Sequence, residues 1–552
     1  MSARGTYVGS TPKFSLRLIF GLAALFAAIT WGTPVCIASS SDPVIDTESG
    51  QLQGTVGTQE ISYLGIPYAA SPVGDLRWMP PTPFGNWTGI FQAVAPGSAC
   101  PQFNDTMKMV GSENCLFLNV YTPRGKDTVK PHDRAVLVWI HGGGLTKGVG
   151  SEYDPTPLVE GGDIIVVTFN YRLGLLGFFA EADIDSEPHL AGNYGLMDQQ
   201  FALAWVQKNI AAFGGDPNRV TVAGESAGGL SVYSQLASPL AAGLFQQAIA
   251  QSGAYAGFTD YRGEILPLAT AETTGYLPFV EPGSYYATEA MCTGGTSAAN
   301  AACLRALTFD DLLALQGKSA VFPTVDGKLL TETPEDAFTD DNFNHVPVIT
   351  GNNHDEYRYF VANDFTLPIA NSQYSSVFSM VFASMASSVE MQYPASKKPS
   401  PPIDDTELKL AAAGTDGIFV CPARLAERSL SLHVTVYAYE FDDEHAPPPA
   451  QPFPGLNFPL GAYHSADVQY LFNLGGVPAP FKKDQKKLSK AMISYWTHFV
   501  KSGDPNSAEQ PDWAPYVSSI DERQSFVPPT PVVELGSTFD TFHKCTAYWD
   551  GQ

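Results

Sequence analysis

A serine, an acidic pair and a histidine follow one another along the chain in an order that suits nucleophilic catalysis. Ser226 stands in the pentapeptide GESAG (224–228), a G-x-S-x-G pattern typical of a sharp turn between a strand and a helix. A serine hydroxyl reacts near neutral pH only when a neighbouring base takes its proton. Asp355 and Glu356 come next in the sequence, and His464 follows them. This order is expected when the acid and the base follow later strands of the same sheet.

The two glycines of the pentapeptide have a mechanical role in the predicted turn. A side chain at Gly224 or Gly228 would strike the neighbouring strand or helix. The pattern alone is weak evidence, because an ordinary strand-to-helix turn or a flexible loop can have the same composition. The apolar residues before it and the acid and histidine after it favour a catalytic serine.

His464 is the histidine best placed to act as the base, because it follows the last predicted strand. Taken alone, a histidine of this kind is more often structural. The other candidates are less well placed. Charged loops are predicted to contain His132, His445 and His543, and an apolar helical segment contains His498. His354 lies directly beside the proposed acid.

The tetrapeptide HGGG (141–144) could stabilise the negative charge that develops when a carbonyl is attacked. Backbone N–H groups of Gly143, Gly144 and Ala227 could donate to this oxyanion, and glycines permit the close approach and unusual dihedrals that this requires. A flexible turn is the alternative interpretation. A phosphate-binding loop is disfavoured, because Lys147 does not stand in the required G-x-x-x-x-G-K-[ST] pattern.

The elements that must position these residues are predicted to alternate between strands and helices. Apolar runs of strand type are predicted at 135–140, 163–170, 219–223, 346–350 and 434–441. Residues 195–210 approximate helical spacing. The alternation predicts an α/β fold with a large, mostly parallel central sheet flanked by helices. The less regular regions, roughly 255–345 and 357–430, are interpreted as helical insertions that form the walls of a substrate gorge.

The sequence resembles the type-B carboxylesterase and lipase family, a cholinesterase-like branch of the α/β-hydrolase superfamily. Matching stretches cover nearly the whole chain after the leader: LGIPYAASPVGDLRW (64–78), ENCLFLNVYTP (113–123), VWIHGGG (138–144), NYRLGLLGFF (170–179), 193–229, VPVITGNNHDE (346–356), AYHSADVQYLF (462–472) and KCTAYWD (544–550). The resemblance implies that Ser226 is the nucleophile, Glu356 the orienting acid and His464 the general base. Asp355 is the second choice for the acid. Gly143, Gly144 and Ala227 match the family's oxyanion hole.

The resemblance implies a serine carboxylic-ester hydrolase that works through an acyl-enzyme on small to medium esters, without a metal or organic cofactor. The loop between Cys100 and Cys115 contains no tryptophan, which argues against a choline-ester specialist, since a cation–π contact would bind the quaternary ammonium. The same loop is too short for a long mobile lid, which disfavours the alternative of a true lipase on long-chain acylglycerols. The other alternative is a catalytically silent adhesion or binding module, which is disfavoured because all three triad residues are present.

Six cysteines remain when Cys36 is set aside, and they predict disulfides rather than a metal site. None stands in C-x-x-C or in zinc-ligand spacing with histidine. In an oxidising compartment an even number suggests three bridges, and the spacing favours two short ones, 100–115 and 292–303. The resemblance implies the pairs Cys100–Cys115 and Cys292–Cys303, and also Cys421–Cys545, a pairing that varies in the family.

The composition bounds the function further. Of the 552 residues, 44% are apolar, so the chain can build a substantial core. There are 31 basic and 56 acidic side chains, and the formal charge is −25. Such a surface repels phosphate backbones, so nucleic acid is not expected as a partner. The expected partner is a small-molecule ester, and the oligomeric state is left open.

Residues 1–40 are predicted to be a signal peptide, because a basic start is followed by an apolar run at 18–29 and then by small residues. The run is too short to span a bilayer comfortably, so stable membrane insertion is not expected. Residues 41–552 are predicted to form a single domain in a secreted or periplasmic protein. Asn86 and Asn104 begin glycosylation sequons.

Overall fold

The computed structural model describes most of the chain after residue 42. The described residues are 43–124, 133–257, 265–275, 280–317, 319–394, 405–450 and 453–551. They fall within one compact unit that spans Ile37–Gln552. The predicted signal peptide, 1–40, lies outside the described residues.

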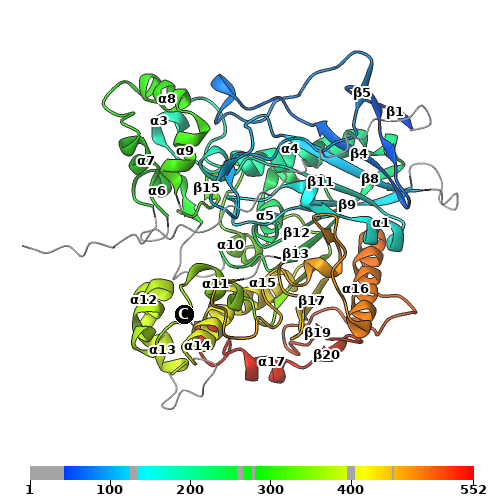
Figure 1. The fold of residues 1–552 in the computed structure, drawn as a ribbon, viewed down its shortest axis with the longest axis vertical. Helices are drawn as coiled ribbons and strands as arrows, with labels where there is room; N and C mark the ends of the chain where they lie inside the picture. Colours follow the sequence, from blue (N-terminus) through cyan, green and yellow to red (C-terminus); the bar gives the residue numbers. More distant parts are fainter. Residues whose placement is uncertain are drawn as a thin grey trace, which may run out of the picture. The chain divides into compact units, whose positions relative to one another are not determined.

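One large sheet passes through these residues (Figure 1). Its eleven strands lie in the order β20-β19-β17-β16-β13-β12-β9-β11-β8-β4-β3. The run from β19 to β11 is parallel throughout, whereas β20 and the strands β8, β4 and β3 pair antiparallel at the two edges. In that order the strands span Val532–Glu534, Arg523–Phe526, Val436–Phe441, Val348–Asn353, Gln247–Gln251, Gly215–Glu225, Arg134–Ile140, Ile165–Phe169, Phe117–Pro123, Glu60–Pro67 and Thr55–Val56.

The central strands are apolar along their whole length because both faces of the sheet are covered. In β9, for example, Val136 and Val138 belong to one buried cluster, and Leu137 and Trp139 belong to another on the opposite face. Alternation of this kind follows from the two-residue period of a strand. The predicted mostly parallel sheet flanked by helices is confirmed.

Helices from different parts of the chain cover the two faces. On one face α5 (Ala227–Ala237) packs against β12 and β13, and α15 (Cys421–Leu430) packs against β16 and β17. On the other face α16 (Lys483–Ser502) packs against β9, β12 and α1 (Thr156–Gly162). The predicted helix at 195–210 is α4 (Tyr194–Asn209), which packs against α5 and β12.

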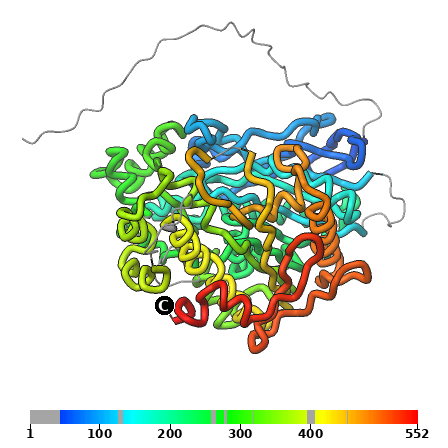
Figure 2. Tube along the Cα trace, turned by 60° about the horizontal axis from the view of Figure 1, so that its bottom comes forward, coloured from blue at the N-terminus to red at the C-terminus, as the bar shows by residue number. Residues whose placement is uncertain are grey.

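The two irregular regions contain short helices that lie on the left in both views (Figures 1 and 2). The first contains α6 to α9 and the second α12 to α14. Their bounds are Leu268–Thr273, Gly283–Glu289, Ser297–Ala306, Phe309–Gln316, Tyr374–Phe382, Ala386–Gln392 and Asp405–Gly414. A single stretch of π-helix, Thr415–Val420, joins α14 to α15 within the described residues.

Three disulfides join the six cysteines in the pairs that the resemblance implies. They are Cys100–Cys115, Cys292–Cys303 and Cys421–Cys545. The first two close short loops, and the third links residues 124 positions apart. The third bridge therefore holds the end of the chain against the start of α15.

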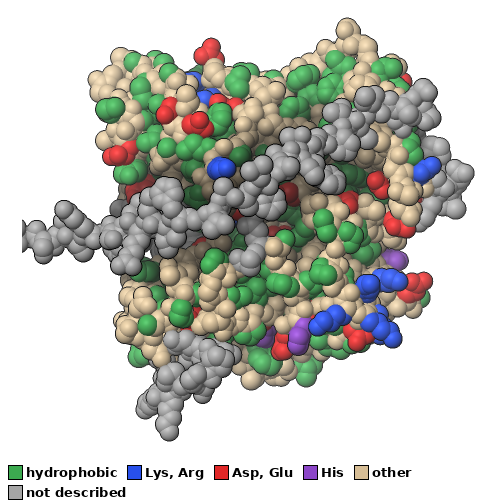
Figure 3. All heavy atoms as spheres, in the orientation of Figure 1, with side chains coloured by type: hydrophobic (Ala, Val, Ile, Leu, Met, Phe, Trp, Pro, Cys, Tyr) green, Lys and Arg blue, Asp and Glu red, His purple; other side chains and the backbone are tan. Residues whose placement is uncertain are grey.

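The surface has no single acidic patch on the face shown in Figure 3, where acidic side chains are spread among polar and apolar ones. Lys and Arg side chains gather near α16 on this face. Among the described helices, none has the length and apolar character needed to cross a membrane.

Candidate active site

Ser226 sits at the turn between β12 and α5, where the sequence pattern placed it. Its backbone has φ 57° and ψ −121°, a conformation that is rare and costly for a residue with a side chain. Its N–H donates to the carbonyl oxygen of Gln251 at the end of β13, 2.9 Å away. The parallel neighbour strand thus helps to hold the strained turn.

The flanking glycines are required by close backbone contacts. A Cβ at Gly224 would lie 2.5 Å from the carbonyl carbon of Gly228. A Cβ at Gly228 would lie 2.0 Å from the carbonyl oxygen of Ile140, the last residue of β9. Real Cβ atoms do not approach backbone so closely, so the structure supports the mechanical reason predicted for both glycines.

Glu356 and His464 are brought together although 108 positions separate them. Nδ1 of His464 lies 2.5 Å from Oε2 of Glu356. The other carboxylate oxygen of Glu356 accepts hydrogen bonds from the Asn353 N–H, at 2.8 Å, and from the Ser252 hydroxyl, at 2.5 Å. Both Glu356 and His464 are buried. The Glu356 carboxylate is therefore held in place by the Asn353 N–H and the Ser252 hydroxyl, and it orients the His464 imidazole.

Asp355, the second choice for the acid, has other partners. Its carboxylate pairs with Arg358 at 2.8 Å and accepts from the Ala462 N–H at 3.0 Å. It also lies 3.2 Å from Nδ1 of His354. The structure places Glu356, and not Asp355, against the imidazole of His464.

The second ring nitrogen of His464 faces the residue that precedes the serine. Nε2 lies 3.4 Å from Oε1 of Glu225, which also accepts from the Ser465 hydroxyl at 2.5 Å. Within the described chain Nε2 has no hydrogen-bond partner, and no hydrogen bond joins it to Ser226. Such contacts are often long in the absence of substrate.

Buried acids control the protonation of this imidazole. Burial disfavours the charged ring, but the negative charges of Glu225 and Glu356 outweigh burial and raise the pKa of His464 to about 9. Burial also raises the pKa of Glu225 to about 7, against the attraction of His464. A buried acid whose pKa lies near neutrality next to a histidine is typical of a functional site.

The HGGG loop lies directly beside the serine turn. A Cβ at Gly142 would lie 3.1 Å from the Cβ of Ser226. Gly143 has φ 106° and Gly144 has φ 61°, values that favour glycine. Among the backbone hydrogen bonds of loops, turns and helix caps in the described chain, none is donated by the N–H of Gly143, Gly144 or Ala227. Ala227 begins α5, so its N–H also has no acceptor within the helix.

His141 is buried and anchors the start of the glycine loop through its contacts with Tyr171. Its ring stacks on Tyr171 with centroids 4.5 Å apart, and the Tyr171 hydroxyl donates to the His141 carbonyl oxygen at 2.8 Å. Burial lowers the pKa of His141 to about 4, so the ring stays neutral. A neutral ring packed in this way holds the loop and carries no charge into the site.

Several residues of this site were missed by sequence reasoning. Glu225, Ser252 and Asp467 form a buried polar shell around Glu356 and His464; Asp467 accepts from the Gln251 side chain at 2.7 Å. The adjacency of Glu225 to Ser226 and the position of Asp467 three residues after His464 were the available signals.

Aromatic side chains cover the imidazole. The ring of Phe360 in α11 (Tyr357–Asp364) lies 4.9 Å from that of His464, and the ring of Phe419 in the π-helix lies 5.0 Å from it. Both belong to the second irregular region. This region therefore forms part of the apolar wall of the site, and no sequence motif marked either residue.

Among the described residues, one group of three side chains is spaced to hold a metal ion: His354, Glu440 and His543. The group does not include Ser226, Glu356 or His464. His543 was predicted in a charged loop, but it is buried.

Comparison with known proteins gives a consistent result. A profile of the carboxylesterase family matches residues 41–528. Similar proteins include pyrethroid hydrolase Ces2e of Rattus norvegicus, 32% identical over 91% of this chain and 88% of the relative. Cocaine esterase of Homo sapiens is 31% identical over 86% of each chain.

Solved structures of PNB esterases share the fold. One PNB esterase superposes with a TM-score of 0.72 at 29% identity and covers 91% of this chain and 99% of its own. A thermophilic PNB esterase gives a TM-score of 0.73 at 28% identity, again covering 91% and 99%. The sequence profile, the relatives and the fold agree, so the chain belongs to the carboxylesterase family and is an enzyme that hydrolyses carboxylic esters.

Proposed function

We propose that Ser226, His464 and Glu356 hydrolyse esters through an acyl-enzyme. The observation that carries this proposal is the arrangement of His464, whose Nδ1 is held by Glu356 while its Nε2 faces Glu225, the residue before Ser226. A ring held at Nδ1 keeps its other nitrogen available for the serine proton.

The first half of the reaction forms a bond between the Ser226 oxygen and the ester carbonyl carbon. Nε2 of His464 takes the hydroxyl proton as this bond forms and then gives it to the departing alcohol, so the C–O bond of the ester breaks. In the second half, water gives a proton to Nε2 and attacks the acyl carbon. The acid leaves, and the proton returns to Ser226.

The tetrahedral intermediates carry a negatively charged oxygen, which hydrogen-bond donors must stabilise. The N–H groups of Gly143, Gly144 and Ala227 are proposed to supply them, supported by the absence of other backbone acceptors for them among the described residues and by the position of Gly142 against Ser226. Ala227 also lies at the N-terminus of α5, where the helix dipole favours negative charge. One such donor is typically worth about 3 kcal/mol of barrier.

Small to medium esters are the proposed substrates. Phe360 and Phe419 give the site apolar walls that suit an uncharged ester. Relatives are named for chemically different substrates, including pyrethroids, acylcarnitines and cocaine. These names favour an esterase over a lipase, and they also disfavour a silent binding module.

Export to a secreted or periplasmic location is proposed as well. The three disulfides support it, because such bonds persist in oxidising compartments. The basic and apolar pattern of residues 1–40 supports it further. The sequons at Asn86 and Asn104 would be used only in a host that glycosylates exported proteins.

Replacement of the serine tests the proposed reaction. Ser226→Ala is expected to lower the rate of p-nitrophenyl acetate hydrolysis by at least about 1000-fold, because the acyl-enzyme can no longer form. Ser234→Ala is the matched control, since Ser234 is a buried serine of α5 whose hydroxyl, within the described chain, bonds to the Leu230 carbonyl oxygen and not to His464. Circular dichroism should show that both variants fold. A Ser226→Ala enzyme that keeps more than a few per cent of wild-type turnover would exclude the mechanism.

A further inference from the structure

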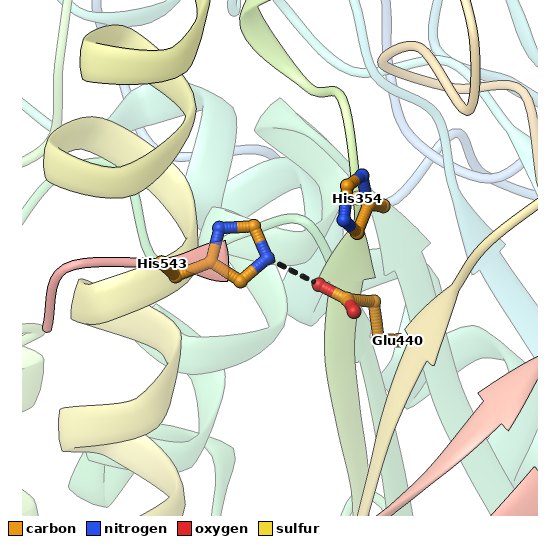
Figure 4. Close-up of side chains that lie close together, drawn as sticks. All are labelled: His354, Glu440 and His543. Atoms are coloured by element: carbon orange, nitrogen blue, oxygen red, sulfur yellow. Dashed lines mark hydrogen bonds and ion pairs between the residues drawn. The ribbon is translucent and has the colours of Figure 1, made fainter. Parts of the chain in front are cut away.

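Three potential metal ligands from distant parts of the chain meet at the carboxyl ends of two neighbouring strands. His354 follows the last residue of β16, Glu440 lies in β17, and His543 follows α17 (Gly536–Phe542). Figure 4 shows the three side chains turned toward one another. One ligand atom from each lies within 4.8 Å of the others.

The group is enclosed and well packed. Glu440 is 1% exposed and His543 is 2% exposed, whereas His354 is partly accessible from solvent. The two imidazole rings lie with their centroids 5.2 Å apart. A buried cluster of this kind needs compensation for every polar atom, so its hydrogen bonds are informative.

Each histidine has a carboxylate on the same ring nitrogen. Nδ1 of His543 lies 2.7 Å from Asp416, and Nδ1 of His354 lies 3.2 Å from Asp355. Nε2 of His543 then faces Glu440, with 2.8 Å to its Oε1. The described residues supply no hydrogen-bond partner for Nε2 of His354. Metal-binding histidines are typically oriented in this way, with a carboxylate on the nitrogen that does not bind the metal.

A second carboxylate lies against Glu440. Glu534, the last residue of β20, interacts with Glu440, and its Oε2 is a buried atom without a hydrogen-bond partner in the described chain. Two adjacent buried carboxylates repel each other unless a proton or a cation lies between them. Either a cation at the cluster or a proton shared between the two carboxylates would satisfy this oxygen.

We propose that His354, Glu440 and His543 bind a divalent transition-metal ion, Zn²⁺ in particular. Two imidazoles and one carboxylate form a known zinc donor set, in which the ligand atoms lie about 3.3 Å apart around the ion. Glu534 or water would complete the tetrahedron. His354 is the partly exposed ligand, so its side chain can move in to shorten the longer separations.

The proposed ion would cross-link the end of the chain to the strand ends next to the active site. His354 is two residues from Glu356, and His543 is two residues from the Cys421–Cys545 bridge. The ion would therefore stabilise the C-terminal segment against the sheet. The competing description is a network of ion pairs and hydrogen bonds with no metal.

Metal titration of the untagged full-length protein separates the two descriptions. After treatment with dipicolinate, the protein is titrated with Zn²⁺ by calorimetry, and its thermal unfolding is followed with and without the ion. We expect one tightly bound ion per chain and a rise of several degrees in Tm. Glu440→Gln and, independently, His354→Gln should each weaken binding by at least about 100-fold.

His345→Gln is the matched control. His345 is exposed and His433 is partly buried, and each lies 2.8 Å from the same Asp341 oxygen, so the pair could collect metal adventitiously. This variant should bind Zn²⁺ like the wild type. Absence of stoichiometric binding, binding unchanged in His354→Gln and Glu440→Gln, or binding lost in His345→Gln would each overturn the proposal. X-ray absorption of the zinc complex should show two imidazole ligands, and a spectrum without them would also contradict it.

Discussion

Single residues around His464 determine when it can act as a base. The imidazole must be neutral to take the serine proton, yet the charges of Glu225 and Glu356 outweigh burial and raise its pKa to about 9. Glu356 raises this pKa, but it also orients the imidazole ring through Nδ1. Glu225 contacts Nε2, the nitrogen that must receive the proton, so its charge opposes deprotonation at the reactive position.

Neutralising Glu225 should therefore extend activity to lower pH. The profile of kcat/KM is expected to rise as His464 loses its proton, and in the wild type this rise should lie above the ordinary imidazole pKa of 6.5. Glu225→Gln removes an attraction for the imidazolium, which lowers the pKa of His464. The rising limb is expected to move to lower pH by roughly one pH unit or more.

Glu225→Asp is the companion variant, because it keeps the charge while changing the length of the side chain. Its rising limb should stay closer to the wild-type position than that of Glu225→Gln. A Glu225→Gln profile that stays in place, or moves to higher pH, would show that Glu225 does not control the protonation of His464.

At the scale of elements, the serine turn depends on three strands and a helix that approach at backbone distance. Gly228, in the first turn of α5, faces the carbonyl oxygen of Ile140 in β9, and the N–H of Ser226 donates to the end of β13. These contacts allow no side chain at position 228. The strained serine is thus held by its neighbours rather than by its own preference.

Gly228→Ala should be strongly destabilising. The new Cβ would lie 2.0 Å from a backbone oxygen that cannot move without shifting β9, and overpacking of this kind costs about 2 kcal/mol or more. We expect a clear fall in Tm together with loss of esterase activity.

Gly161→Ala in α1 makes the same change where only the Cγ2 atom of Ile493, a movable side-chain end, lies closer than 3 Å. This variant should keep its Tm within about two degrees, because alanine also favours a helix. Equal Tm values for the two variants would contradict the argument from backbone contact.

The π-helix is a second element with a role at the site. Phe419 packs on His464, while Asp416, three residues earlier, bonds to His543. π-Helical turns are rare and are often found at functional sites. The extra residue in the turn lets one short segment contact both the imidazole and the proposed metal ligands.

For the whole molecule, the three disulfides contribute unequally to stability. The Cys421–Cys545 bridge closes a loop of 124 positions, and the Cys292–Cys303 bridge closes one of 11. A bridge stabilises mainly by restricting the unfolded chain, so the expected contributions are roughly 5 and 3 kcal/mol.

Replacing each pair by serine checks this order. The double variant at 421 and 545 should show the larger fall in the midpoint of thermal unfolding, measured at one scan rate and without added metal. A larger fall for the variant at 292 and 303 would show that local strain or packing, and not loop length, dominates.

Much of this fold could be predicted because its signals are local. The apolar runs of β9 and β11 and the glycines around Ser226 reflect burial and backbone contact that single segments must satisfy. The order of Ser226, Glu356 and His464 follows from the order of strands in a parallel sheet.

The rest depends on contacts between distant segments. His543 was expected in a charged loop, but it is buried. Its two ring nitrogens form hydrogen bonds with the carboxylates of Asp416 and Glu440, each more than 100 positions away in the sequence. Likewise nothing near Phe419 in the sequence indicates that it covers His464. Pairings of this kind have no periodic pattern, so composition and spacing do not show them.

Trapping of the acyl-enzyme tests the central claim most directly. Wild-type protein mixed rapidly with p-nitrophenyl acetate and quenched in acid should carry one acetyl group per chain, and peptide mass spectrometry should place it on Ser226. A burst of about one equivalent of p-nitrophenol should accompany it. An acetyl group found reproducibly on another residue, or turnover without any acetylated enzyme under conditions that trap a reference serine esterase, would contradict the account.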